Sequence, residues 1–159
     1  MSIVEAEMGN VAPLPLSIRV RLAGPRDCEA LCQLLDTHRE NGREHAREQV
    51  LAWLETAGTT LLVAQSEVGV LGVAVLMTRI MPKPGGGMHK VVEVDNLVVR
   101  SDRRGQRIGR RLLAACVEWS RQRRAAQVEV MVGDTNPDAR RFYEAYGFAQ
   151  AADRLVLAA

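Results

Sequence analysis

A chain of 159 residues, 47% hydrophobic and 25% charged, is long enough for one domain with a full core. Its formal net charge of +2 excludes a whole-molecule field that would drive it onto nucleic acid or a membrane. No apolar run approaches the roughly 18 residues that a membrane-spanning helix needs, so we expect a cytoplasmic protein without membrane contact.

The first fifteen residues contain two glutamates and no basic segment, which is not the pattern of a signal peptide. We therefore expect a loose leader over 1–15 and a single domain over 16–159. The three cysteines and three histidines lack the spacing of zinc ligands, so we expect no metal. Cys28 and Cys32 lie four apart on a predicted helix and are interpreted as small core residues rather than a redox pair.

Hydrophobic periodicity and turn residues divide the rest of the chain into alternating strands and helices. We predict, in order, a strand at 16–23, helices at 24–39 and 44–56, strands at 59–65, 69–80 and 89–100, a helix at 106–123, a strand at 127–133, a helix at 137–146 and a last strand at 148–158. This order predicts an α/β protein built on a mixed sheet.

The segment RRGQRIGRRLL, residues 103–113, places two glycines and five arginines where a strand ends and a helix begins. The first N–H groups of a helix have no acceptor within it and attract anions, pyrophosphate above all. Gly105 allows a tight turn, and Gly109 allows a ligand to approach the backbone. The segment fits neither GxxxxGK[ST] nor GxGxxG, so the two best-known nucleotide loops are excluded.

Four of the six aromatic residues fall within 142–148, on and just after the helix that begins at Pro137. Ala139, Phe142 and Tyr146 share one helical face and are predicted to pack in the core. Tyr143 lies two turns after Asn136 on a different face, where packing alone does not require a phenol.

Together these segments resemble the GNAT superfamily of acetyl-CoA-dependent N-acetyltransferases. VEVDNLVVRSDRRGQRIGRRLL is similar to the strand, loop and helix signature of that family, and NPDARRFYEAYGF is similar to its second motif, N-x-x-A-x-x-F-Y-x-x-x-G-F. The resemblance extends from about residue 60 to 150. It implies a mixed, largely antiparallel sheet of about six strands, flanked by about four helices.

The resemblance implies that acetyl-CoA is the co-substrate and that the loop and its helix bind the pyrophosphate. The pantetheine arm would pair with the backbone around Leu97, Val98 and Val99, with an N–H of Val98 or a neighbour aimed at the thioester oxygen. The implied cofactor residues are Leu97, Val98, Val99, Arg104, Gly105, Gln106, Arg107, Ile108, Gly109, Arg110, Asn136 and Tyr143. Arg107 stands where the family most often has glycine, and the amides still reach a pyrophosphate if Arg107 keeps a helical φ.

Acetyl transfer also requires a base for the amine and a proton for the leaving thiolate. Tyr143 is the candidate acid, because a phenol with a pKa near 10 can protonate a thiolate whose thiol has a pKa near 8.5. Glu93 and Asp95 lie two apart on the predicted 89–100 strand, so they face one side and are both candidate bases. Asn96 is expected on the opposite face.

The predicted function is acetyl transfer to a primary amine by direct attack on the thioester, with a non-catalytic acetyl-CoA-binding regulatory domain as the alternative. A nucleic-acid binder is disfavoured, because no aromatic residues are interleaved with the basic run. The acceptor, a small molecule or a peptide, stays open. A homodimer is possible.

Overall fold

The structure is a computed structural model that describes residues 17–36, 42–151 and 156–158. Within these ranges it contains a five-stranded sheet and four α-helices. The strands are β1 (Arg19–Leu22), β2 (Thr59–Ser66), β3 (Gly69–Pro82), β4 (Met88–Val99) and β5 (Gln127–Val130). The helices are α1 (Cys28–Asp36), α2 (Gly42–Glu55), α3 (Ile108–Gln122) and α4 (Pro137–Tyr146), with 3₁₀ turns η1 (Pro25–Asp27) and η2 (Ser101–Arg103).

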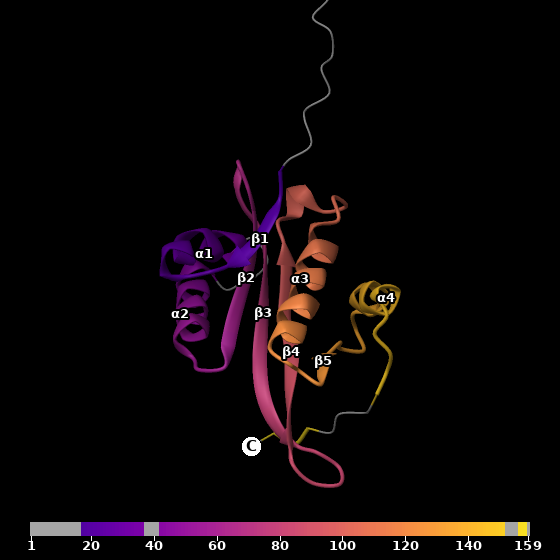
Figure 1. Cartoon of the computed structure of the whole chain (residues 1–159). Helices are drawn as coiled ribbons and strands as arrows, with labels where there is room; N and C mark the ends of the chain where they lie inside the picture. Colours follow the sequence, from indigo (N-terminus) through magenta and orange to yellow (C-terminus); the bar gives the residue numbers. More distant parts are fainter. Residues whose placement is uncertain (1–16, 37–41, 152–155, 159) are drawn as a thin grey trace, which may run out of the picture.

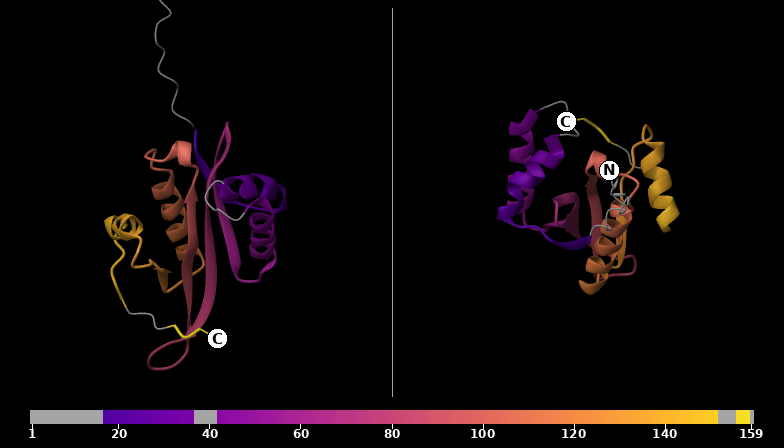
Figure 2. Two further views of the ribbon diagram at one scale, coloured as in Figure 1. Left: turned by 180° about the vertical axis from the view of Figure 1, so that it is seen from behind. Right: turned by 90° about the horizontal axis from the view of Figure 1, so that it is seen from above.

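The sheet runs in chain order from β1 to β5, and each neighbouring pair is antiparallel except β4 and β5, which are parallel. Helices α1 and α2 cover one face, and α3 and α4 lie on the other (Figure 1). The view from above in Figure 2 shows the same three layers, with α4 set apart from α1 and α2 by the sheet and α3. The predicted mixed, largely antiparallel sheet with four helices is confirmed.

The central strands are apolar on both faces because each face is covered by a pair of helices. One core cluster lies on the α3 side of the sheet and includes Leu76, Leu112 and Cys116. The other lies on the α1 and α2 side and includes Leu35, Val50 and Val75. Beyond these clusters the β3–β4 hairpin continues past the body of the molecule, as Figure 1 shows.

The predicted sixth strand at 148–158 is not formed by the residues described there, 148–151 and 156–158. Among the described residues, 156–158 form no strand, and Val156 and Leu157 are 75% and 94% exposed, so no neighbouring element covers their side chains. The predicted first helix begins instead as η1, and its last residues, like the leader at 1–15, lie outside the described residues. The 69–80 strand is extended through Pro82, which ends it.

An ion pair between half-buried Arg21 and buried Asp27 joins β1 to the turn that starts the first helix. Arg21 donates from Nη1 and Nη2 to the Asp27 carboxylate at 2.9 and 2.7 Å, and the Gly24 N–H donates to the same carboxylate at 2.9 Å. Arg21 also donates from Nε to Gln65 on β2 at 2.6 Å. The hydrogen bonds from Arg21, and that from Gly24, lower the pKa of Asp27 against the effect of burial.

We expect Asp27→Asn to lower the free energy of unfolding at pH 7 by about 2–3 kcal/mol, because it removes the charged acceptor of two hydrogen bonds from the half-buried Arg21. The folded-state pKa of Asp27 is depressed, so its stabilisation is complete above the unfolded value near 3.9 and is lost as pH falls through the folded value. Urea denaturation should show the difference from wild type shrinking as pH falls below about 4.

Asp102→Asn is the matched control, because Asp102 is an exposed carboxylate paired with Arg100. It should leave the urea midpoint at pH 7 nearly unchanged. Equal losses in the two variants would mean that burial of the Arg21–Asp27 pair contributes nothing.

Candidate functional site

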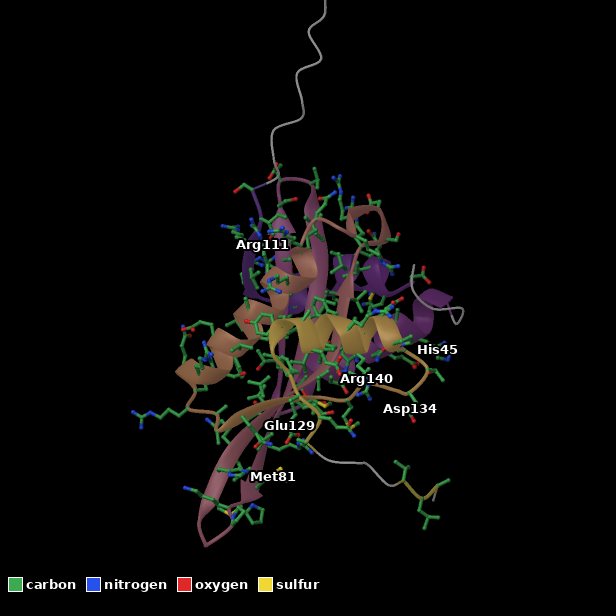
Figure 3. The ribbon with its side chains drawn as sticks, turned by 90° about the vertical axis from the view of Figure 1, so that its right-hand side faces the viewer. His45, Met81, Arg111, Glu129, Asp134 and Arg140 are labelled. Atoms are coloured by element: carbon green, nitrogen blue, oxygen red, sulfur yellow. The ribbon has the colours of Figure 1, made fainter. Side chains whose placement is uncertain are left out.

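A cleft of about 620 Å³ opens between the end of β4, the N-terminus of α3 and one side of α4. Figure 3 looks onto α4, which carries Arg140, with Arg111 of α3 above it and Glu129 of β5 below it. The cleft is lined by Leu97, Val98, Val99, Arg103, Arg104, Gly105, Arg107, Ile108, Gly109, Arg110, Ala139, Phe142, Tyr143 and Ala145.

The cleft exists because β5 accompanies β4 for only part of its length. The parallel ladder ends with Val94 opposite Val130, and among the described residues β4 then has only β3 beside it. The Arg100 N–H donates to Leu71 on β3 at 2.8 Å. Because backbone groups alternate along a strand, Val98 also directs its N–H at β3. The backbone N–H and carbonyl groups that point into the cleft are therefore those of Leu97 and Val99. The sequence predicted that Val98 or a neighbour would supply the N–H donor, and this geometry leaves only the two neighbours.

A β-bulge interrupts β4 at the point where β5 ends. Val94 lies opposite Leu76 and Asn96 lies opposite Val75, so Asp95 is an extra residue without a partner in the ladder. Glu93 lies opposite Met77, two residues from Val75 on the same face of β3, so Glu93 and Asn96 share a face. The expectation that Asn96 points away is overturned, since it rested on unbroken alternation.

The two candidate bases lie outside the cleft lining and have different surroundings. The Glu93 side chain is 13% exposed, and its carboxylate lies 3.3 Å from Nη2 of Arg79, which also donates to Glu129 at 2.6 Å. Asp95 is exposed and accepts a hydrogen bond from Asn96 Nδ2 at 2.7 Å. Within the described chain, Asp95 has no cationic partner.

The loop before α3 aims its free N–H groups at the mouth of the cleft. The helix starts at Ile108, and its first backbone hydrogen bond runs from the Arg111 N–H to the Arg107 carbonyl at 3.0 Å. The N–H groups of the three residues between them therefore have no acceptor within the helix. Gly105 has φ +78°, which glycine adopts without strain.

Arg107 has φ +60° and ψ +18°, so it does not keep the helical φ on which the sequence argument depended. This left-handed conformation costs a non-glycine residue roughly 1–2 kcal/mol. Arg107 therefore adopts the backbone that glycine would supply at the same position, and the loop keeps its course with an arginine side chain at the cleft.

Gly109 leaves the floor of the cleft open. A Cβ placed there would lie 3.5–3.6 Å from Leu97, Phe142 and Val99, which is ordinary contact. The protein's own packing therefore does not exclude a methyl group. What glycine provides is space between the helix backbone and the free edge of β4.

On α4 the residues predicted to pack in the core, Ala139, Phe142 and Tyr146, do pack against the core cluster, but Tyr143 is buried there as well, which the sequence did not predict. Tyr143 is the buried residue of this helix, at 9% exposure, and its ring packs edge-on against Phe142 and Phe148 at 5.1 and 5.5 Å. Phe142, Ala139 and Tyr146 are only partly buried, and the first two line the cleft. Helical periodicity did not predict the burial of Tyr143, because α4 contacts the core cluster and also lines the cleft. Burial, and to a lesser extent Cys116, raises the pKa of Tyr143 to about 12.

Two predicted cofactor residues do not line the cleft. Gln106 is exposed in the loop. Asn136 is the N-cap of α4, where its Oδ1 accepts from the Ala139 N–H at 3.0 Å and only its amide nitrogen is left to donate elsewhere. The other ten predicted positions line it, and sequence reasoning missed Arg103, Ala139, Phe142 and Ala145.

Arg103 was missed although its position next to the loop was a usable signal. Its Nε is buried without a hydrogen-bond partner and lies 3.6 Å from an Asp102 oxygen, which is beyond hydrogen-bond distance. A buried guanidinium donor without an acceptor beside helix N–H groups suits a phosphate.

The described residues contain no group of three or more potential metal ligands. They also contain no helix that is long and apolar enough to cross a membrane.

The free edge of β4 lies beside the N-terminus of α3 in an α/β fold, and this arrangement is suited to an extended, phosphate-bearing ligand. The chain belongs to the GNAT acetyltransferase family, whose model matches residues 28–148.

Solved structures share the fold at low sequence identity. An aminoglycoside N-acetyltransferase in complex with CoA is 15% identical, with a TM-score of 0.77, over 94% of this chain and 98% of its own. A ribosomal-protein-alanine N-acetyltransferase from Brucella melitensis is 19% identical, with a TM-score of 0.73, over 89% and 99%. A tetramutant protein from Bacillus halodurans is 22% identical, with a TM-score of 0.76, over 89% and 99%. No curated protein matches the sequence significantly.

We expect Arg107→Gly to raise the free energy of unfolding by about 0.5–1 kcal/mol, because relief of the left-handed backbone outweighs the added freedom of the unfolded chain. Arg124→Gly is the matched variant, since Arg124 has φ +57° and does not line the cleft. It should stabilise by a similar amount, while only Arg107→Gly weakens CoA binding in calorimetry. A loss of stability confined to Arg107→Gly would show that its side chain contributes more than the strain costs.

Proposed function

We propose that the protein transfers the acetyl group of acetyl-CoA to a primary amine, by direct attack of the amine on the thioester. The observation that carries this proposal is the free edge of β4 beside the N-terminus of α3. An extended amide chain can pair with such an edge, and a pyrophosphate suits the helix end. We assign the activity to one domain over 16–159, in the cytoplasm, and a homodimer is compatible with it.

The pyrophosphate end is served by backbone and side-chain donors together. The N–H groups of Ile108, Gly109 and Arg110 have no acceptor within α3, and among the described residues the buried Nε of Arg103 has no hydrogen-bond partner. An anion there would satisfy them, and the surrounding arginines would balance its charge. The space above Gly109 would let the ligand pass close to the helix backbone.

The pantetheine end is served by the backbone of β4. Leu97 and Val99 direct their N–H and carbonyl groups into the cleft, as an added strand requires. One of these N–H groups would stabilise the oxyanion that develops on the thioester, and such donors typically contribute 10²–10³-fold in rate. The amide nitrogen of Asn136 would donate to the same arm.

The attacking amine must lose a proton, and Glu93 or Asp95 can accept it directly or through a water molecule. Glu93 is held by Arg79, while Asp95 is exposed beside the bulge. Both carboxylates also favour an acceptor that arrives as a cation.

Tyr143 would stabilise the departing thiolate. Its pKa of about 12 keeps the phenol protonated, but transfer of that proton to a thiolate whose thiol has a pKa near 8.5 is uphill by about 5 kcal/mol in the empty cleft. The phenol would therefore act first as a hydrogen-bond donor to the sulfur. The proton released by the acylated ammonium, a far stronger acid, would complete the neutralisation.

We expect wild type to release CoA thiol from acetyl-CoA with at least one class of amine in a panel of amino acids, polyamines, aminoglycosides and peptides. Tyr143→Phe should lower kcat by roughly 10²-fold, with little change in CoA affinity, because it removes only the donor to the sulfur. Unchanged kcat would reject this role. Tight CoA binding without turnover across the panel would favour the non-catalytic regulatory domain.

We expect Glu93→Gln to lower kcat/KM by at least tenfold below pH 7 and less at higher pH, where more amine is already deprotonated. Asp95→Asn is the matched control two residues further along β4, and it should change KM for cationic amines more than kcat. A pH-dependent loss of kcat/KM in Asp95→Asn, and not in Glu93→Gln, would identify Asp95 as the base.

A further inference from the structure

Two cysteines of α1 lie together outside the acetyl-transfer machinery. The Sγ atoms of Cys28 and Cys32 are 4.0 Å apart, one helical turn from each other. Cys28 is half-buried at the first residue of α1, and Cys32 is 1% exposed, in the core cluster between α1, α2 and the sheet. A ligand could therefore enter past Cys28, with Cys32 behind it.

The helix prevents these thiols from forming a disulfide. Residues four apart on an α-helix have Cβ atoms about 5–6 Å apart, whereas a disulfide requires about 3.5–4.5 Å. Closing the bond would unwind the first turn of α1. A single ion between the sulfurs makes no such demand, because two metal–sulfur bonds of about 2.3 Å can span up to about 4.6 Å.

The surroundings partly compensate a pair of thiolates. The positive end of α1 lies at Cys28, and Arg47 of α2 favours the Cys32 thiolate, while Glu29 on α1 opposes it. Burial and the hydrogen bond with Cys28 raise the pKa of Cys32 to about 11, so a bound cation must displace its proton.

We propose that Cys28 and Cys32 form a two-thiolate site for a soft monovalent metal ion, with copper(I) as the ion that a sulfur pair selects. Each thiol gives up its proton to solvent, two copper–sulfur bonds form, and no electron is transferred. The site is independent of the acetyl-CoA cleft, which lies on the other side of the sheet.

Cys116 supplies the internal control. It is fully buried in the opposite core cluster, where burial raises the pKa of its thiol to about 12. A lone thiol in an apolar core offers one sulfur and no route for an ion.

The test is an anaerobic titration of the reduced, full-length protein with copper(I), in competition with the chromophoric chelator bicinchoninate. Wild type and Cys116→Ser should bind one equivalent with equal affinity, and their melting temperatures should rise on binding. Cys28→Ser should bind at least tenfold more weakly. Because Cys28 is only half-buried, this variant should fold, and its melting temperature without metal checks that it does.

Copper(I) affinity in Cys28→Ser equal to that of wild type would overturn the proposal, and so would its loss in Cys116→Ser. A second measurement tests the geometric argument. Diamide treatment of the folded protein should leave both thiols titratable, and a mass loss of two hydrogens that disappears in Cys28→Ser would show that the pair is a disulfide switch instead.

Discussion

The pairing of β5 with β4 over only four residues is the constraint on which the rest of this structure depends. If β5 paired with the whole of β4, the backbone N–H and carbonyl groups of β4 would all be hydrogen-bonded within the sheet, and none would be left beside α3 and α4. Because β5 stops at Val130, β4 continues without a neighbour on that side among the described residues, and α4 lines the cleft beside it. Helix α3, which follows β4 in the chain, then begins beside the free edge of β4. Strand donors and helix donors, which usually lie on different parts of a protein, meet in one cleft.

Much of this could be predicted from the sequence because it depends on local rules. The apolar runs of 59–80 and 89–99 are long enough to mark buried strands, and RRGQRIGRRLL marks a helix start by its glycines and charge. Through their resemblance to the GNAT signature, the strand and loop segments point to nine of the cleft-lining positions, and NPDARRFYEAYGF adds Tyr143. The start of α4 is equally local: Pro137 favours the first helical position, and the sequence allows Thr135 or Asn136 as the N-cap, which the structure places at Asn136.

The errors come from tertiary contacts that periodicity does not encode. Tyr143 was separated from the core because a helical wheel assumes one buried face, whereas α4 lies between the core and the cleft. The left-handed backbone of Arg107 was not predicted, because such conformations are rare for arginine and only the course of the loop imposes it. The last strand was predicted from its apolar residues, although a strand also requires a neighbour.

The bulge at Asp95 divides β4 into two segments of opposite parity. Before the bulge, the even-numbered residues Val92 and Val94 face α3. After it, the odd-numbered residues Leu97 and Val99 face α3. One additional residue thereby lets a single strand serve as sheet core and then as cleft wall. The faces after Asp95 are consequently set by the bulge: if β4 kept all its residues but paired without a bulge, every side chain from Asn96 up to α3 would lie on the opposite face. Sequence comparison within such a chain must therefore count residues here, since identity alone will not show which face a side chain occupies.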